Sequence, residues 1–112
     1  MKYKVTYTAA AKKDLRNIFR YISEKLLSTQ NAVGQTERIM TAIRSLDTMP
    51  KRNRLYEKEP WHGRGLRFFP VDNYLVFYKV DEETEMVYVV RIMYSGRDIH
   101  KLLRQTEDVL GT

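Results

Sequence analysis

The spacing of apolar residues changes along the chain, and the changes mark the predicted elements. Residues 2–8 alternate between apolar and polar side chains in the period-two manner of a strand. From Ala9 the spacing becomes three and four residues, which predicts an amphipathic helix with Thr8 as its N-cap. A break at residues 28–29 separates this helix from a second one, which ends before Pro50. Because the link is short, we expect the two helices to form an antiparallel hairpin.

The second half of the chain predicts an irregular connection followed by strands. Residues 49–65 contain two prolines and two glycines and read as a long loop. Three runs rich in aromatic and β-branched residues follow at 66–71, 74–80 and 86–94, and short polar turns join them into an antiparallel meander. The helix hairpin is the cover that we expect for the sheet. The predicted fold is α+β in the order β-α-α-β-β-β, an antiparallel sheet with a helix hairpin on one face, in a single domain over residues 1–112.

The last predicted strand carries an arginine among apolar residues. Alternation would turn Tyr88, Val90, Ile92 and Tyr94 toward the helices, which leaves Arg91 on the other, uncovered face of the sheet. On that face a charge costs little free energy. With the opposite assignment of faces, Arg91 would need a buried carboxylate partner.

Composition limits the chemistry and the compartment. The chain has no cysteine, so disulfides and thiolate metal sites are excluded, and a reducing compartment fits. There is no signal-peptide pattern at the start and no apolar run near the roughly 18 residues of a membrane span. We therefore expect a cytoplasmic protein that does not enter a membrane. With two histidines and no carboxylate motif at ligand spacing, we expect no metal and no cofactor.

Positive charge is the strongest feature of the composition. The formal net charge is +6, and residues 51–67 contain six basic side chains against two acidic ones. Such a segment attracts phosphate polyanions or an acidic protein partner, or it is a solvated loop that keeps the protein soluble. One reading is a plain nucleic-acid-binding module, which predicts strong salt dependence and no toxicity on expression.

Three stretches together resemble a known superfamily. They are AAKKDLRNIFRYI at residues 10–22, GLRFFPVDNYLVFYKV at 65–80 and VRIMYSGRD at 90–98. In this order and at this length the chain resembles, over about residues 2–103, the RelE/ParE superfamily of toxins from bacterial type II toxin-antitoxin systems. The resemblance implies a small basic toxin that inhibits growth, is neutralised by a cognate antitoxin with an acidic toxin-binding part, and belongs to the modules known for plasmid stabilisation.

The residues indicate which branch of the superfamily fits better. RelE-like members are ribosome-dependent mRNA endoribonucleases, and their pattern has lysines on the strand matching residues 66–69 and an arginine after the tyrosine of the next strand. It also has an arginine after the last strand and a tyrosine near the C-terminus. Here the first strand offers Arg67, Leu75 follows the tyrosine, Arg97 matches, and the C-terminal segment has no tyrosine. The pattern is thus closer to ParE, which poisons DNA gyrase and has no known catalytic residues, and we lean toward a protein that is not an enzyme.

Six residues are the candidates for the functional site. For a metal-independent nuclease they are Arg67, Arg91, Arg97 and His62; for target or antitoxin binding they are Arg64, Arg67, Arg91, Tyr94 and Arg97. We expect Arg67 and Arg91 to share a basic patch on the open sheet face, and Arg97 to stand at its rim after the break at Gly96. Tyr94 is expected in the core, with a stacking or hydrogen-bonding role as the alternative.

Overall fold

The structure, a computed structural model, describes residues 2–106; Met1 and residues 107–112, which include the last part of the predicted domain, lie outside the described residues. The helices and strands are, in chain order, β1 (Lys4–Tyr7), α1 (Ala9–Arg20), α2 (Thr29–Arg44), β2 (Arg67–Val71), β3 (Tyr74–Asp81), β4 (Met86–Tyr94) and α3 (Ile99–Gln105). A π-helical turn, Tyr21–Lys25, extends α1. Short 3-10 turns, Ser45–Asp47 and Pro50–Arg52, follow α2. The sequence did not predict α3.

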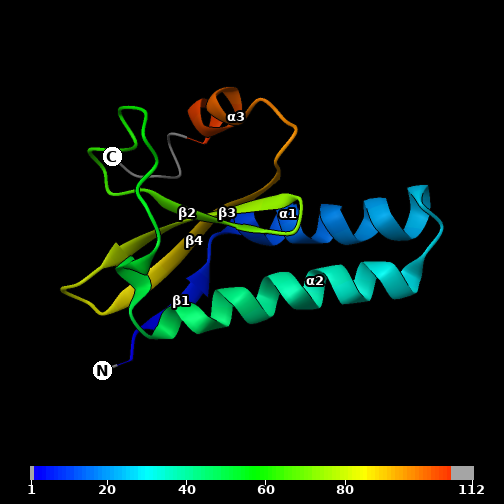
Figure 1. The fold of residues 1–112 in the computed structure, drawn as a ribbon, viewed down its shortest axis with the longest axis horizontal. Helices are drawn as coiled ribbons and strands as arrows, with labels where there is room; N and C mark the ends of the chain where they lie inside the picture. The colour runs from blue at the N-terminus through cyan, green and yellow to red at the C-terminus, as the bar shows by residue number, and fades with distance from the viewer. Residues whose placement is uncertain (1, 107–112) are drawn as a thin grey trace.

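The four strands form one sheet in the order β1-β4-β3-β2. β2, β3 and β4 are antiparallel neighbours, as the predicted meander requires. β1, by contrast, pairs with β4 in parallel, so the α+β fold is confirmed with a mixed sheet in place of a wholly antiparallel one. In Figure 1 the hairpin of α1 and α2 lies along one side of the sheet, and α3 lies on the other side.

Side-chain caps begin both long helices, and the cap of α1 is the one that the sequence predicted. The Thr8 hydroxyl accepts a hydrogen bond from the Ala11 N–H at 3.1 Å and donates one to the Val90 carbonyl at 3.0 Å. The first bond caps α1, and the second ties the start of this helix to β4. Ser28 caps α2 in the same way, because its hydroxyl accepts from the Asn31 N–H at 3.2 Å.

Both faces of the sheet are covered, contrary to the prediction of one open face. The helix-side core contains Ala11, Ile18, Ile22, Ala32, Ile39, Ile43, Val76, Val89 and Ile92. The second core, on the opposite face, contains Tyr56, Trp61, Leu66, Phe77, Val90, Met93 and Leu103. Residues 54–66 and α3 supply the cover of this second core (Figure 1). Trp61 at its centre is fully buried although it belongs to the loop, so the helix hairpin is not the sheet's only cover.

A bulge in the sheet explains why simple alternation assigned the wrong faces in β4. The pairing of β3 with β4 shifts between Phe77 and Tyr78, so β4 has one extra residue at this point. As a result Val89 packs in the helix-side core and Val90 in the second core. The prediction for Val90 was therefore wrong, while Ile92 does face the helices.

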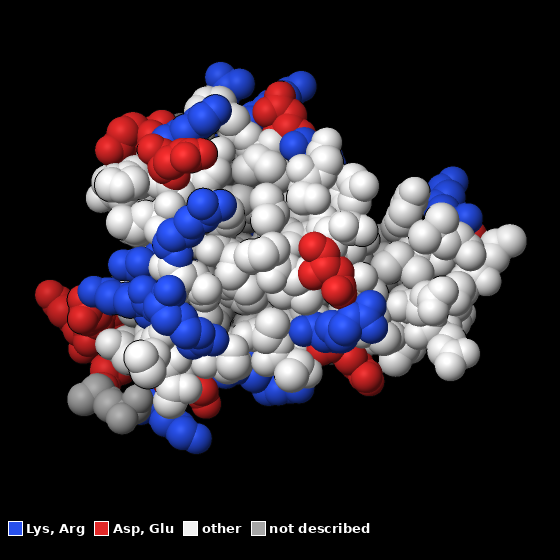
Figure 2. All heavy atoms as spheres, viewed as in Figure 1, with Lys and Arg blue, Asp and Glu red and all other residues white. Residues whose placement is uncertain are grey.

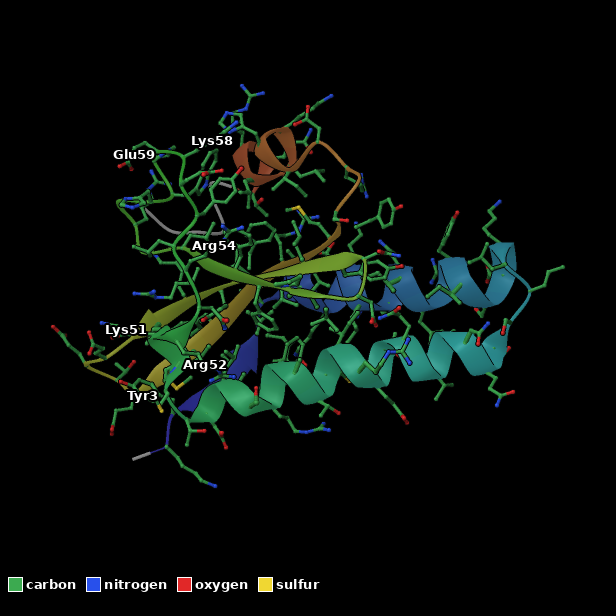
Figure 3. All side chains as sticks on the ribbon, viewed as in Figure 1. Tyr3, Lys51, Arg52, Arg54, Lys58 and Glu59 are labelled. Atoms are coloured by element: carbon green, nitrogen blue, oxygen red, sulfur yellow. The ribbon has the colours of Figure 1, made fainter. Side chains whose placement is uncertain are left out.

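The segment before β2 gathers positive charge on one part of the surface. Figure 2 shows basic side chains concentrated in the left half of the view, and Figure 3 places Lys51, Arg52 and Arg54 along the chain that leads from α2 to β2. Lys51 forms an ion pair with Glu82 at the turn between β3 and β4. Along residues 2–106, no helix is both long and apolar enough to cross a membrane.

Candidate functional site

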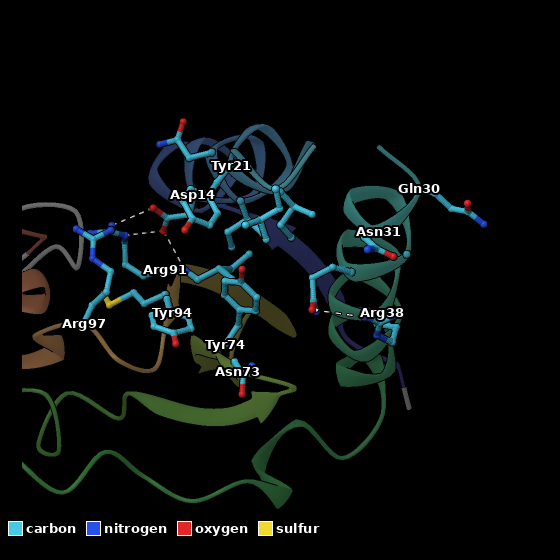
Figure 4. Close-up of a pocket in the computed structure, with 18 residues that line it drawn as sticks. Asp14, Tyr21, Gln30, Asn31, Arg38, Asn73, Tyr74, Arg91, Tyr94 and Arg97 are labelled. Atoms are coloured by element: carbon cyan, nitrogen blue, oxygen red, sulfur yellow. Dashed lines mark hydrogen bonds and ion pairs between the residues drawn. The ribbon is translucent and has the colours of Figure 1, made fainter. Parts of the chain in front are cut away.

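A groove lies between the helix hairpin and the end of the sheet. It has a volume of about 1090 Å³. The hairpin supplies one wall and the neighbouring ends of β3 and β4 supply the other (Figure 4). Side chains on its walls include Asp14, Tyr21, Asn31, Arg38, Tyr74, Arg91, Tyr94 and Arg97. The groove forms because the distal part of the hairpin extends beyond the sheet (Figure 1).

Three tyrosines give the groove an aromatic surface. The rings of Tyr74 and Tyr94 meet edge to face, with 5.9 Å between their centroids, which is a favourable arrangement for aromatic pairs. Burial raises the pKa of Tyr74, and the nearby phenols of Tyr21 and Tyr94 raise it further. Tyr21 and Tyr94 are 56% and 50% exposed, so the prediction of Tyr94 as a core residue was wrong. Their exposed faces are available for stacking or hydrogen bonding.

Arg91 points to α1, where a carboxylate receives it. Its Nε and Nη2 atoms donate to the two carboxylate oxygens of Asp14 at 2.6 and 2.9 Å. Both side chains are largely buried, with 15% of Arg91 and 13% of Asp14 exposed. Asp14 also accepts the Ile92 backbone N–H at 2.9 Å, and Arg91 reaches the Thr106 hydroxyl at the end of α3 at 3.5 Å. The expectation that Arg91 lies over an open sheet face was wrong. The structure instead matches the alternative, in which Arg91 has a buried carboxylate partner.

Arg97 stands at the rim of the groove, as the sequence predicted. It is exposed, and its N–H donates to the Tyr94 carbonyl at 3.1 Å in the turn after β4. Its guanidinium has no hydrogen bond or ion pair with another residue of the described chain. Gly96 lets the turn fold this way, because a Cβ there would lie 2.5 Å from a ring carbon of Tyr94. The Tyr94 ring therefore occupies space that a side chain at position 96 would need.

A second ion pair closes the α2 side of the groove. Arg38 donates from Nε to a carboxylate oxygen of Asp72 at 2.8 Å, and Gln35 donates to the same oxygen at 2.9 Å. The hydrogen bond from Arg38, followed by that from Gln35, lowers the pKa of Asp72. These bonds attach α2 to the turn between β2 and β3. They therefore help to hold the two walls of the groove in position relative to each other.

The structure separates the other predicted residues from the groove. The Arg67 guanidinium donates to the carbonyls of Asn53 and Lys51 at 2.7 and 3.2 Å, so Arg67 and Arg91 do not form the expected shared patch. His62 lies 3.7 Å from a Glu59 carboxylate oxygen in the loop before β2. Arg64 belongs to the same loop. Of the six candidates, the groove therefore unites three, which are Arg91, Tyr94 and Arg97.

Sequence reasoning missed several residues of this groove. The pairing of Asp14 with Arg91 could not be predicted, because the two residues are 77 positions apart in the sequence. The sequence feature that could have indicated a role for Asp14 is that it is the one acidic residue of α1, a helix with four basic residues. The sequence analysis did not single out Tyr21 or Tyr74 as functional candidates, and both line the groove.

The groove combines aromatic, amide and charged side chains. Among the described residues of its wall, Arg97 is the cation without a carboxylate partner, because Asp14 pairs with Arg91 and Asp72 pairs with Arg38. Neither His62 nor His100 is among the described residues that line it. Aromatic rings, amide groups and one free guanidinium are typical of a surface that recognises another macromolecule.

Comparisons with known proteins give the same fold. The toxin of the chromosomal ParDE system from Pseudomonas aeruginosa aligns with a TM-score of 0.68 and 17% identity, over 83% of this chain and 96% of that one. A mutant of Escherichia coli RelE in the free state aligns at 0.64 with 14% identity, over 97% and 98%. A chain of the RelBE2 complex from Mycobacterium tuberculosis aligns at 0.58 with 19% identity, over 84% and 99%. A search of curated protein sequences gave no match.

These structures define the class of fold, which is that of the RelE/ParE toxins. The family profile described as ParE toxin of type II toxin-antitoxin system, parDE, matches residues 5–99. The chain belongs to this ParE toxin family. The predicted membership of the RelE/ParE superfamily, and the lean toward its ParE branch, are thereby confirmed.

Proposed function

We propose that this toxin inhibits growth by binding an essential target, DNA gyrase, and that it does so without cleaving RNA. The observation that carries the proposal is the apolar filling of the sheet face where the nuclease pattern places its polar residues. Leu66 is fully buried, Leu75 packs against the second core, and the C-terminal segment contributes the fully buried Leu103. Metal-free RNA cleavage needs cations and proton-transferring groups around a phosphate, and these three positions carry aliphatic side chains instead.

The alternative is a ribosome-dependent endoribonuclease that uses Arg67, Arg91, Arg97 and His62. Its residues would have to converge on one phosphate. Arg91 is held by Asp14 and Arg67 by backbone carbonyls, while neither Arg67 nor His62 lines the groove of Arg97. The separation of these side chains favours binding over catalysis.

The proposal includes neutralisation by a cognate antitoxin in the cytoplasm, and the groove is the surface that we assign to it. Tyr21, Leu26, Leu27 and Val33 are exposed by 41–86% at and beside the end of the hairpin, an unusual density of apolar surface. Arg97 adds a free positive charge at the rim of the groove. This combination fits an amphipathic, acidic antitoxin segment. The sheet face on which the sequence predicted a basic patch is covered by residues 54–66 and α3.

A two-arm assay tests the mechanism. Purified toxin is added to a gyrase supercoiling reaction, in which trapped cleaved DNA is scored, and to a cell-free translation reaction, in which codon-position mRNA cleavage is scored. We expect trapped DNA and intact RNA. Cleavage of mRNA that disappears with Arg97→Ala, but persists with Lys101→Ala on the neighbouring helix, would replace the gyrase proposal with the nuclease one.

The antitoxin part of the proposal has its own test. Expression of the toxin alone should stop growth, and co-expression of the product of an adjacent acidic reading frame should restore it. Substitution of Leu26 and Leu27 by serine should weaken antitoxin binding in a pull-down titration, because it removes exposed apolar contact area. Unchanged binding by this variant would place the antitoxin on another surface.

A further inference from the structure

Two arginines beside β2 are fixed in place by backbone carbonyls. Arg52 donates to the Ser45 and Thr48 carbonyls at 3.2 and 2.7 Å. Arg67 donates to the carbonyls of Asn53 and Lys51, as described above. A carbonyl oxygen orients a guanidinium but does not cancel its charge. These two side chains are therefore held in position and still carry a full positive charge.

A third arginine between them is held by an aromatic ring. The Arg54 guanidinium carbon lies 4.8 Å from the centroid of the Phe68 ring, a cation–π arrangement that also leaves the charge uncompensated. Within the described residues none of Arg52, Arg54 and Arg67 forms an ion pair with a carboxylate. We call these three residues the arginine patch. Figure 2 shows basic side chains gathered at this part of the surface, and Figure 3 labels Arg52 and Arg54 there.

The surroundings of the arginine patch favour nucleic acid over protein as its ligand. Among the described residues with large exposed apolar side chains, only Met49 belongs to the segment that carries the patch; most of the others lie at the hairpin or the groove. A protein interface usually has an apolar core, whereas a protein–nucleic acid interface is polar and strongly positive. Fixed guanidiniums also lose little conformational entropy when they bind.

We propose that the arginine patch binds the phosphate backbone of duplex DNA. It is a surface separate from the groove assigned to the antitoxin, and it does not depend on the gyrase proposal. Three guanidiniums held by the fold contact successive phosphates. The contacts are independent of base sequence because none of these side chains needs to contact the edge of a base. The toxin can then hold DNA and a protein partner at the same time.

Fluorescence anisotropy with a labelled 20-base-pair duplex tests the proposal across a series of salt concentrations. For three phosphate contacts we expect the logarithm of the binding constant to fall with the logarithm of salt at a slope of about −2.7. Arg52→Gln, Arg54→Gln and Arg67→Gln together should weaken binding by about tenfold or more and should remove most of this slope.

Two matched variants separate the patch from net charge and from folding. In the first variant, glutamine replaces three exposed lysines of the hairpin, Lys12, Lys13 and Lys25. This variant loses as many charges as the glutamine variant of the arginine patch, and it should keep most of the affinity for DNA. Replacement of the three patch arginines by lysine loses the same carbonyl and ring contacts but keeps the charge, so it should retain binding to within a few-fold. Circular dichroism verifies that each variant is folded at the assay temperature.

Three results would overturn the proposal. Equal losses in the patch and hairpin glutamine variants would mean that only the overall charge matters. Loss of binding in the lysine variant to the level of the glutamine variant would mean that the arginines act through structure. Tighter binding of polyglutamate than of duplex DNA, with the same dependence on the arginine patch, would identify an acidic polypeptide as the ligand.

Discussion

The carboxylate of Asp14 and the guanidinium of Arg91 face each other in a two-pronged ion pair at the junction of α1 and β4, with contacts of 2.6 and 2.9 Å. The pair is largely screened from solvent, and the same carboxylate holds the Ile92 N–H. It fixes the strand end that carries Tyr94 and Arg97 against the helix hairpin. The geometry of the groove therefore depends on an ion pair whose two side chains are themselves largely buried.

Removing one member of this pair should destabilise the protein. Asp14→Ala leaves Arg91 charged, mostly buried and unpaired, so we expect the free energy of unfolding to fall by about 3 kcal/mol. Urea denaturation followed by circular dichroism measures the change. As a control, Arg38→Ala breaks the exposed pair with Asp72 and should have little effect. Equal effects of the two substitutions would contradict the structural role of Asp14.

The buried tryptophan of the loop predicts a second effect on stability. Trp61 has no exposed surface and packs edge to face with Tyr56 and with His100 of α3. Trp61→Ala should lower the free energy of unfolding by about 3–5 kcal/mol through lost contacts and a cavity. Trp61→Phe should cost clearly less, because an aromatic ring still fills most of the site. A loss below about 1 kcal/mol in the alanine variant would mean that the loop is not part of the cooperative core.

Gly96 offers a way to move Tyr94 without removing its phenol. Since a methyl group at position 96 would clash with the ring, Gly96→Ala should displace Tyr94 and weaken antitoxin binding by about tenfold, a cost of about 1.4 kcal/mol. Isothermal titration calorimetry measures the affinity, and Ser95→Ala is the neighbouring control.

A double-mutant cycle checks that Gly96 acts through Tyr94. The variant with both Gly96→Ala and Tyr94→Ala should bind no more weakly than Tyr94→Ala alone. Additive losses would mean that Gly96 acts through the backbone of the turn.

Alkaline pH should reduce stability through buried tyrosines. Burial raises the pKa of Tyr78 above its ordinary value of 10.0 and outweighs the hydrogen bond from Asn53, which lowers it. The unfolded chain therefore releases this proton at lower pH than the folded one. The stabilisation is complete below pH 10 and is lost as pH rises through the folded-state pKa.

Urea denaturation at a series of pH values from 8 to 11 measures this loss, with approximate end points chosen around the ordinary tyrosine pKa. In Tyr78→Phe the fall in unfolding free energy above pH 10 should be shallower than in the wild type. Tyr88→Phe, at a more exposed position, serves as the control and should keep the wild-type profile. Parallel profiles for all three proteins would show that Tyr78 does not contribute to the pH dependence.

Local signals in the sequence were sufficient for most of the helices and strands. The change from period two to a helical period located β1 and α1, and the hydroxyl of Thr8 makes the cap that its position predicts. The turns between the last three strands likewise defined the meander. These features depend on neighbouring residues alone, which is why they can be predicted from one sequence.

The features that the sequence did not predict depend on distant contacts. The bulge at Phe77 and Tyr78 adds one residue to β4, and a single insertion reverses every later face in a period-two pattern. The partner of Arg91 lies in the first helix, and the cover of the second core comes from a loop whose apolar residues, such as Trp61, follow no period. The same contacts decide which predicted residues meet in the groove and which do not.

The short length of β1 has a consequence for how the free toxin behaves at high concentration. β3 pairs with one side of β4 along its length, but on the other side the described residues place no strand beside β4 after Val89, the partner of Tyr7. Such an exposed edge would pair with edges of other copies and seed aggregation. The Thr8 hydroxyl occupies the Val90 carbonyl there, and Asp14 occupies the Ile92 N–H. Two side chains of one helix thus take the places of a missing strand, and a toxin released from its antitoxin keeps this edge closed to other copies of itself.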